Sequence, residues 1–339
     1  MNALVTGGGG FLGLAIVRRL VARGDRVVSL SRNSHLDLEA LSVTQHHGDI
    51  ADPAAVLQAA AGCDIVFHVA AKAGVWGSYA DYYRANVTGT QNVLEACRRL
   101  GIRRLVYTSS PSVVFNGRDM EGVDESVPYP DHYDAYYPQT KAAAEKLVLA
   151  ANGADVATVA LRPHLIWGPG DNHLIPRIIA RARSGRLRRI GSAFKKIDTI
   201  YIDNAADAHL LAADRLHPGA AVAGRAYFLS QGEPVPTWDF INRILEVAGV
   251  APVTRSIPAW AAYAAGWTLE TWYQLCRIRA EPPLTRFVAR ELATSHWFDI
   301  SAARRDLGYE PKVSIEEGMQ RLAAWLPQNN KTRGLARPR

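Results

Sequence analysis

Cysteine is scarce in this chain, with three residues among 339. Cys63, Cys97 and Cys276 are far apart and show neither the close spacing of a metal site nor that of a disulfide framework. The sequence therefore predicts no metal site. Scattered thiols of this kind are typical of a reducing compartment, so we expect a cytoplasmic protein.

A long apolar run is also missing. The most apolar segment, 258–276, contains Gly266, Glu270 and Gln274 and is at the lower limit of length for crossing a bilayer. We therefore expect no transmembrane helix. A strand and a glycine loop follow Met1 directly, so we expect no signal peptide either.

Aromatic residues recur at helical spacing inside this segment, at Trp260, Tyr263 and Trp267. Such a stripe is most often core packing. The alternatives are the roof of an apolar substrate pocket and a helix that rests on a membrane surface. The sequence leaves these alternatives open, and peripheral membrane contact is among the interactions that we expect.

Acidic residues are the minority charge, and the formal net charge is +7. Four cations lie among the last nine residues, within 327–339, which we interpret as a flexible basic tail. A second basic cluster extends from Arg177 to Lys196. Because no nucleic-acid motif accompanies it, we interpret this cluster as solvated surface and expect no nucleic-acid partner.

Glycine is concentrated in one early turn, Gly7-Gly8-Gly9-Gly10-Phe11-Leu12-Gly13, between an apolar run and an amphipathic helix. Glycines at 7, 10 and 13 fit a strand-turn-helix that holds a pyrophosphate, because a Cβ there would crowd the turn, the phosphates or the strand. The helix N-terminus supplies free N–H groups. A glycine run alone can be a flexible turn, but this context predicts a dinucleotide site at Gly7, Gly10, Phe11, Leu12 and Gly13.

No acidic residue ends the second predicted strand, 26–31, where NAD-binding proteins place a carboxylate for the ribose 2′-hydroxyl. Ser31 and Arg32 stand there instead. A hydroxyl and a guanidinium would satisfy a 2′-phosphate, so the sequence predicts NADP(H). The alternative is an arginine on a solvated turn.

Short β-rich runs alternate with helical patterns through residue 161, which predicts an α/β fold with a Rossmann-type, doubly wound parallel sheet. Strands are expected at 2–6, 26–31, 43–48, 64–70, 103–109 and 155–161, and helices near 11–23, 53–61, 80–100 and 137–152. Further strands are expected near 199–202 and 226–229.

The pattern loosens after Pro163, which predicts a smaller, partly interleaved C-terminal lobe over the strand ends. We expect an NADP-binding domain at 1–168, to which 199–230 returns, and a substrate-binding lobe at 169–198 and 231–326.

Tyr137 and Lys141 are four residues apart at a predicted helix start, so their side chains share one face. A nearby ammonium and the helix dipole both favour a phenolate, which predicts a lowered tyrosine pKa suited to acid–base catalysis. Ser110, at the end of the fifth strand, is the candidate for holding the substrate oxygen. Ser109 and Ser112 are close competitors for this role.

Together these motifs resemble the extended short-chain dehydrogenases/reductases over essentially the whole length. The motifs are TGGGGFLG, GDI, HVAA, RANVTGT, YTSS, YPQTK, LRPHLIWGPGD and FDISAARRDLGY. The resemblance implies that Asp49 and Ile50 flank the adenine. It also implies that Ala70, Ala71 and Lys72 contact the ribose and nicotinamide, with Pro163 at the carboxamide end. Asn86 would brace the loops near the cofactor, and Lys141 would bond the nicotinamide ribose.

Within that family, AAKAGVWGSYADYYRANVTGTQNV, YTSSPSVVFNGRD and EPPLTRF resemble the branch of 3β-hydroxysteroid and sterol-4-carboxylate dehydrogenases and bacterial 2-alkyl-3-oxoalkanoate reductases. The last group implies NADPH-dependent reduction of a long-chain 3-keto acid in olefin biosynthesis, by a homo-oligomer associated with thiolase, β-lactone synthetase and β-lactone decarboxylase. The alternatives are a steroid or sterol dehydrogenase and a non-catalytic NADP-sensing scaffold. A nucleotide-sugar epimerase or dehydratase fits less well, because the loop after Lys72 and the aromatic helix favour an apolar substrate over a sugar.

Overall fold

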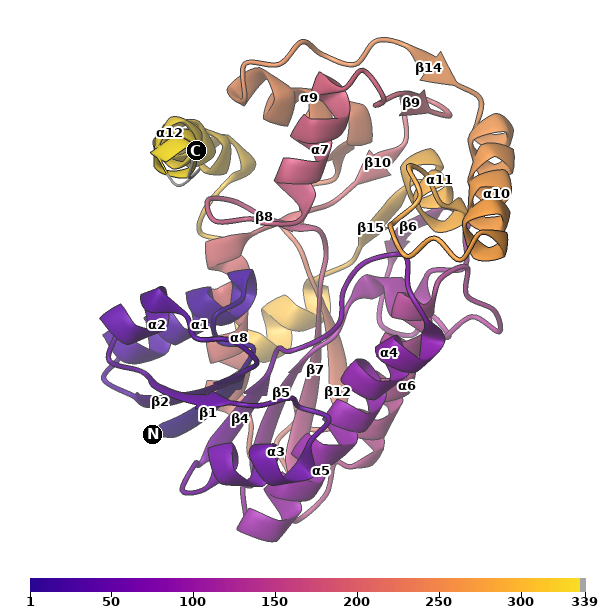
Figure 1. Cartoon of the computed structure of the whole chain (residues 1–339). Helices are drawn as coiled ribbons and strands as arrows, with labels where there is room; N and C mark the ends of the chain where they lie inside the picture. Colours follow the sequence, from indigo (N-terminus) through magenta and orange to yellow (C-terminus); the bar gives the residue numbers. More distant parts are fainter. Residues whose placement is uncertain (336–339) are drawn as a thin grey trace.

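The computed structural model describes residues 1–335, and the side chains of residues 1–327. A seven-stranded, all-parallel sheet in the order β12-β7-β5-β4-β1-β2-β3 forms its centre (Figure 1). The strands are β1 Asn2–Thr6, β2 Arg26–Ser31, β3 Thr44–His47, β4 Ile65–His68, β5 Arg104–Thr108, β7 Ala157–Pro163 and β12 Arg225–Leu229. The predicted doubly wound α/β sheet is confirmed.

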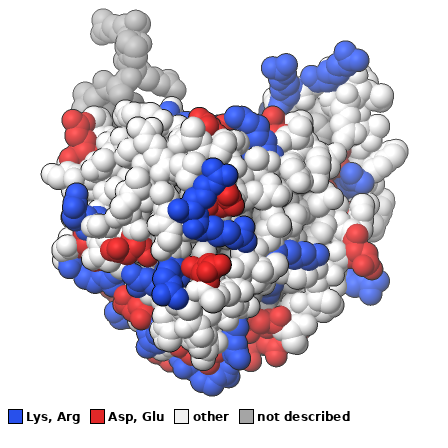
Figure 2. Space-filling view, turned by 90° about the horizontal axis from the view of Figure 1, so that it is seen from below, with Lys and Arg blue, Asp and Glu red and all other residues white. Residues whose placement is uncertain are grey.

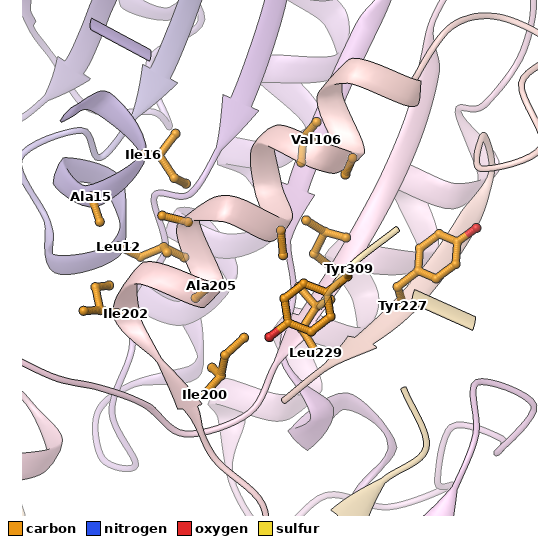
Figure 3. Close-up of a cluster of buried hydrophobic side chains, with 14 of the residues drawn as sticks. Leu12, Ala15, Ile16, Val106, Ile200, Ile202, Ala205, Tyr227, Leu229 and Tyr309 are labelled. Atoms are coloured by element: carbon orange, nitrogen blue, oxygen red, sulfur yellow. The ribbon is translucent and has the colours of Figure 1, made fainter. Parts of the chain in front are cut away.

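Helices cover both faces of this sheet, so its strands are apolar on both sides. In β1, Ala3 and Val5 face one hydrophobic cluster while Leu4 faces another. One face carries α1 Phe11–Ala22, α2 Leu36–Ala40 and α8 Ile202–Arg215, and Figure 3 shows α8 lying beside α1, in front of the strands. The other carries α3 Pro53–Ala60, α4 Tyr79–Tyr83, α5 Gly89–Leu100 and α6 Tyr136–Ala150.

Local sequence signals set the ends of several helices. The Asp52 side chain accepts a hydrogen bond from the Ala54 amide (3.0 Å) and Pro53 opens α3, as the sequence predicts. Gly101 ends α5 with φ +68°, a conformation that glycine adopts without strain. The single helix expected at 80–100 is instead interrupted by a π-helical turn at Arg84–Thr88.

A smaller lobe stands over the carboxyl ends of the strands (Figure 1). Its four-stranded sheet has the order β13-β10-β15-β6, and two further pairs are β11–β8 and β14–β9. These strands are β6 Met120–Val123, β8 Ile166–Trp167, β9 Arg189–Ile190, β10 Lys196–Ile197, β11 Ile200–Tyr201, β13 Val235–Pro236, β14 Ser256–Ile257 and β15 His296–Phe298. The strand expected near 199–202 is therefore β11, which pairs with β8 and lies outside the main sheet.

Helices of the small lobe are α7 Leu174–Arg183, α9 Thr237–Val247, α10 Ala259–Leu275, α11 Arg286–Ala293 and α12 Ile315–Leu335. Short turns at Pro111–Val114 and Ala303–Leu307 complete the described elements. The helix α12 extends into the segment 327–339 that is expected to be a tail, and residues 336–339 lie outside the described residues. No helix of the described chain is long and apolar enough to cross a membrane.

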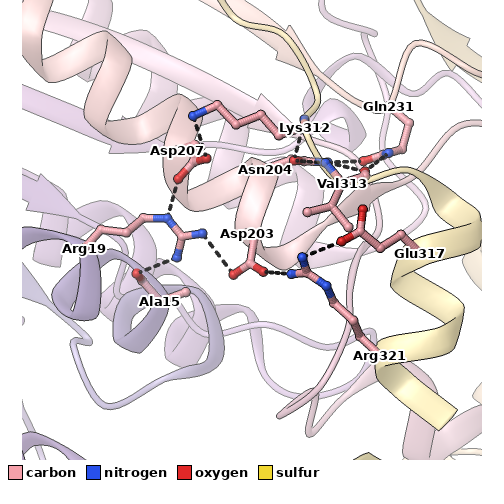
Figure 4. A network of polar contacts seen from close by, with 10 residues as sticks. All are labelled: Ala15, Arg19, Asp203, Asn204, Asp207, Gln231, Lys312, Val313, Glu317 and Arg321. Carbon is pink, nitrogen blue, oxygen red and sulfur yellow. Dashed lines mark hydrogen bonds and ion pairs between the residues drawn. The ribbon is translucent and has the colours of Figure 1, made fainter. Parts of the chain in front are cut away.

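Charged side chains connect α1, α8 and α12 (Figure 4). The Arg19 guanidinium donates to both Asp203 and Asp207 of α8, and Asp203 also accepts from Arg321 of α12 at 2.9 Å. This network ties α1, the helix that begins at the glycine turn, to α8 and α12.

Candidate active site

A cavity of about 820 Å³ lies at the carboxyl edge of the parallel sheet. Strand order reverses there, between β1 and β4, which is where ligands enter open α/β sheets. The lining includes all but one of the predicted site residues: Gly7, Gly10, Phe11, Leu12, Gly13, Ser31, Arg32, Asp49, Ile50, Ala70, Ala71, Lys72, Ser110, Tyr137, Lys141 and Pro163. The exception is Asn86.

The glycine turn is packed so closely that side chains are excluded from it. A Cβ on Gly13 would lie 2.1 Å from the Gly7 carbonyl oxygen, and Gly7 itself has φ +71°. The helix α1 begins at Phe11 with no side chain capping its first amides. Uncapped N–H groups at a helix start that a Cβ would obstruct fit a bound pyrophosphate.

The crevice between β1 and β4 is held by one threonine. The Thr6 hydroxyl bonds His68 Nδ1 at 2.8 Å and accepts the amides of Val69 and Ala70, each at 3.1 Å. Burial and the nearby Lys141 lower the pKa of His68 to about 3, so this imidazole is neutral. These bonds hold Val69 and Ala70, the first residues after β4, in the wall of the cavity.

At the other end of the cavity, Ser31 and Arg32 lie beside Asp49. The Ser31 hydroxyl donates to the Asn33 carbonyl at 2.9 Å, and Arg32 is exposed without an ion pair among the described residues. Asp49 pairs with Arg84 at 3.0 Å and accepts the Ala51 amide. The free cation in this corner is therefore Arg32.

Tyr137 lies at the start of α6, where it faces Ser110 from the end of β5. Pro138 occupies the first turn, where its missing N–H costs no hydrogen bond. Among the competing serines, Ser109 and Ser110 line the cavity and Ser112 does not. The Ser110 hydroxyl bonds that of Ser112 at 2.9 Å and accepts its amide at 3.2 Å, which orients the Ser110 hydroxyl.

The predicted lowering of the Tyr137 pKa is wrong for this structure. Burial raises the pKa of Tyr137 above its ordinary value, a hydrogen bond from Ser110 opposes the rise, and the Glu291 carboxylate adds to it when it is ionised. The Lys141 amine is directed elsewhere, since it donates to the Thr108 carbonyl (2.6 Å) and lies 4.2 Å from the Tyr107 ring centre. Tyr137 is therefore held as a neutral phenol, the form that gives up a proton.

Lys141 is buried beside a second ionised pair. Burial lowers the pKa of Lys141 to about 7, and the nearby Glu145 carboxylate raises it in part. Glu145 in turn binds Arg162 through two hydrogen bonds, 2.6 and 3.0 Å long, and accepts the Tyr129 hydroxyl at 2.6 Å. The strand β7 thus supplies the cation that keeps Glu145 charged beneath the lysine.

Asn86 does not line the cavity but holds one of its lining residues, Lys72, through hydrogen bonds. Its side chain accepts the Lys72 amide at 2.7 Å and donates to the Lys72 carbonyl (3.2 Å) and to Thr140 (3.0 Å). It therefore connects the loop after β4 to α6, on which Tyr137 and Lys141 lie.

Glu291 is an acidic neighbour of Tyr137 that no pattern in the sequence indicates. It lies on α11 of the small lobe, about 150 positions further along the chain, and burial raises its pKa to about 8. No motif or spacing connects it to Tyr137. Its position depends on how α11 packs, through Phe287 on Phe115 (6.0 Å between ring centres).

A family model described as the 3-beta hydroxysteroid dehydrogenase/isomerase family matches residues 4–258. The chain belongs to this family. The resemblance to the extended short-chain dehydrogenases/reductases is thereby confirmed, and the protein is an oxidoreductase.

Relatives in this family cover nearly the whole chain. The 2-alkyl-3-oxoalkanoate reductase of Stenotrophomonas maltophilia is 55% identical over 96% of this chain and 99% of its own length. A 3 beta-hydroxysteroid dehydrogenase/Delta 5-->4-isomerase of Mycobacterium tuberculosis is 37% identical over 94% of this chain and 88% of its own. Among solved structures, MoeE5 in complex with UDP-glucose and NAD has a TM-score of 0.74 and 25% identity, covering 97% of this chain and all of MoeE5.

Proposed function

We propose that this protein reduces the 3-keto group of a long-chain 2-alkyl-3-oxoalkanoate to the 2-alkyl-3-hydroxyalkanoate, with NADPH, in olefin biosynthesis. The observation that carries the proposal is the convergence of Ser110, Tyr137 and Lys141 on one cavity that also contains the glycine turn. Reductases of that name from Stenotrophomonas maltophilia and Shewanella oneidensis, 55% and 53% identical, support this substrate class.

The glycine turn and the start of α1 would hold the pyrophosphate, with Arg32 and Ser31 at the 2′-phosphate. When bound, NADPH supplies a hydride equivalent to the carbonyl carbon. Tyr137 donates its proton to the carbonyl oxygen, whose charge develops in the transition state. Ser110 donates a hydrogen bond to the same oxygen and so keeps it against the phenol.

The positions of the two lobes suit a substrate with alkyl chains. We assign cofactor binding to residues 1–168 with 199–230, and substrate binding to 169–198 and 231–326. The segment that enters the small lobe contributes Leu165, Ile166 and Leu174 to the lining of the cavity that also contains Tyr137. These apolar side chains would contact the chains next to the keto group.

The test runs the reaction backward, because β-keto acids lose CO2 spontaneously. NADP+ reduction is measured with a long-chain 2-alkyl-3-hydroxy acid and with a 3β-hydroxysteroid, and both assays are repeated with NAD+. We expect turnover of the hydroxy acid with NADP+ in preference to the steroid. Preference for the steroid would mean that the protein is a steroid dehydrogenase. Binding of NADPH without turnover of the hydroxy acid or the steroid would favour the non-catalytic NADP-sensing scaffold.

The proposal includes a cytoplasmic homo-oligomer that associates with the pathway's β-lactone synthetase and β-lactone decarboxylase. Co-expression of the three chains followed by affinity purification through this one is the direct test. We expect the other two chains in the eluate at fixed ratio. Their absence at micromolar concentration would remove this part of the proposal and leave the reaction unaffected.

A further inference from the structure

The helix α10 exposes an apolar face on the small lobe. Trp260, Trp267 and Trp272 are 76%, 55% and 60% exposed, and Leu275 is 76% exposed. These positions follow one side of the helix, while Ala262 and Gly266 are buried on the opposite side. Trp260 and Trp267 are too exposed to be core residues, and neither lines the cavity. Two of the alternatives for this aromatic stripe, core packing and pocket lining, are therefore wrong for these two residues.

Close backbone packing explains why α10 turns its small residues inward. A Cβ on Gly266 would lie 2.8 Å from the Arg286 amide nitrogen, so α10 lies directly on the start of α11. The one charged residue of α10, Glu270, is buried there and accepts both the amide (2.7 Å) and the side chain (2.6 Å) of Arg286. The exposed face of α10 therefore carries no charge.

Cations flank this uncharged face at both ends. Arg277 and Arg279 follow the end of α10, and Arg255 precedes its start; all three are exposed and have no ion pair in the described part of the chain. Pairing of β9 with β14, where the Arg189 amide donates to the Arg255 carbonyl (2.9 Å), brings the exposed Arg186 to the same end.

The acidic residues of α10 and of the segment that follows it are paired with arginines. Glu281, the acid nearest to Arg279 in sequence, pairs with Arg177 and Arg181 of α7. On the face that is seen from below in Figure 2, by contrast, lysine and arginine lie interspersed with aspartate and glutamate. An apolar helix face that carries no free acid of its own and has free cations at both ends is complementary to an anionic, apolar surface.

The exposed helix is also connected to the wall of the cavity. Trp76, from the loop after β4, donates its indole N–H to the Ile278 carbonyl at 3.4 Å and packs edge-on against Tyr273 of α10, with ring centres 6.1 Å apart. The same loop contributes Lys72 and Ala73 to the cavity lining. Figure 1 shows α10 at the outer edge of the molecule, where a flat surface can reach it.

We propose that the exposed face of α10 is a peripheral docking surface for an anionic phospholipid bilayer. Tryptophan side chains enter the headgroup region, and the arginines at the two ends contact lipid phosphates. A second copy of the chain is a poorer occupant, because antiparallel pairing of two α10 helices would bring Arg255 against Arg277 and Arg279. The proposal concerns a surface and stands whatever the enzyme reduces.

The experiment measures co-sedimentation of the full chain with sucrose-loaded vesicles of phosphatidylcholine, with and without 30 mole per cent phosphatidylglycerol. We expect binding to the anionic vesicles that weakens as salt is raised. The triple variant Trp260→Ser/Trp267→Ser/Trp272→Ser should bind at least about tenfold more weakly. Arg277→Gln/Arg279→Gln should lose about tenfold on anionic vesicles only.

Matched control variants distinguish binding through α10 from non-specific binding of exposed apolar or cationic residues to vesicles. Leu36→Ser removes a leucine that is 83% exposed on α2, across the molecule from α10, and Arg26→Gln/Arg98→Gln removes two exposed cations outside the small lobe. Both controls should bind vesicles as the parent protein does. Circular dichroism and thermal unfolding establish that every variant is folded.

Three results would overturn the proposal. One is a parent protein that does not sediment with anionic vesicles. Another is equal loss of binding in the α10 variants and the matched controls. The third is concentration-dependent self-association that the triple tryptophan variant abolishes without any vesicle binding, which would make this face an interface between copies. Quenching of tryptophan emission by brominated lipid, lost in the triple variant, would support the proposal directly.

Discussion

The seven-stranded sheet and the small lobe are built in different ways. Strands of the sheet pair in parallel register over three to five residues, whereas β9, β10, β13 and β14 of the small lobe have two residues each. Both contain a glutamate–arginine pair, fully buried for Glu145–Arg162 and partly exposed for Glu270–Arg286. Long strand pairings and a fully buried ion pair therefore support the side of the cavity that holds Ser110 and Tyr137, whereas the small lobe depends on short pairings and a partly exposed ion pair.

Removal of the proton donor should have the largest effect. Tyr137→Phe should lower turnover by about a thousandfold or more, because no other hydroxyl in the proposed mechanism gives up a proton. NADPH binding, followed by fluorescence titration, should change by less than about twofold. Tyr136→Phe is the matched control, since Tyr136 is the neighbouring residue and is 43% exposed. Equal losses in the two variants would contradict the assignment.

The two glutamate–arginine pairs give the next largest contrast. Glu145→Gln leaves the Arg162 charge buried without its partner and should reduce the free energy of unfolding by about 3–5 kcal/mol. Glu270→Gln should cost about 1 kcal/mol, because the Arg286 side chain is 32% exposed and water can hydrate it. Urea unfolding at pH 7.5 measures both, and similar losses would break the comparison between sheet and lobe.

Cofactor choice should depend on Arg32, the exposed cation directly after β2. Arg32→Gln should raise the Kd for NADPH about tenfold to a hundredfold, the usual contribution of a charge-assisted hydrogen bond, with little change for NADH. Arg18→Gln, an exposed arginine that does not line the cavity, is the control. Unchanged NADPH affinity in Arg32→Gln would mean that this arginine is only solvated surface.

The buried lysine predicts a pH dependence of stability. Its pKa falls from 10.5 to about 7 on burial, so between these values the unfolded chain binds more protons than the folded chain. Stability should therefore rise with pH through this window, by at most about 1.4 kcal/mol per pH unit. Lys141→Met has no such group. The free energies of unfolding of parent and variant should thus diverge by about 2 kcal/mol between pH 7.5 and 9.5, and parallel curves would contradict this.

Much of the sheet was predictable because its signals are local. The glycine turn, the Pro53 helix start and the alternating apolar runs each require only neighbouring residues, and the structure has the corresponding elements within a few residues of the expected bounds. The spacing of Tyr137 and Lys141 likewise places both on one face of α6. The predicted pKa of Tyr137 failed because burial, which spacing does not report, exceeds the other influences.

The small lobe was less predictable for the same physical reason. Two-residue strands have no periodicity, and β6 pairs with β15 although their sequences are more than 170 positions apart. Glu291 reaches the neighbourhood of Tyr137 only through the packing of α11. The aromatic stripe of α10 was visible in the sequence, but which side it faces depends on the contact of Gly266 with α11.

The most direct test of the central claim is a crystal structure of the protein with NADP+ bound. The account predicts the pyrophosphate on the amides at the start of α1 and the 2′-phosphate beside Arg32. It also predicts the Tyr137 hydroxyl, together with that of Ser110, next to the nicotinamide carbon that carries the hydride. A cofactor bound elsewhere, or a nicotinamide ring remote from the Tyr137 oxygen with another proton donor beside it, would contradict the account.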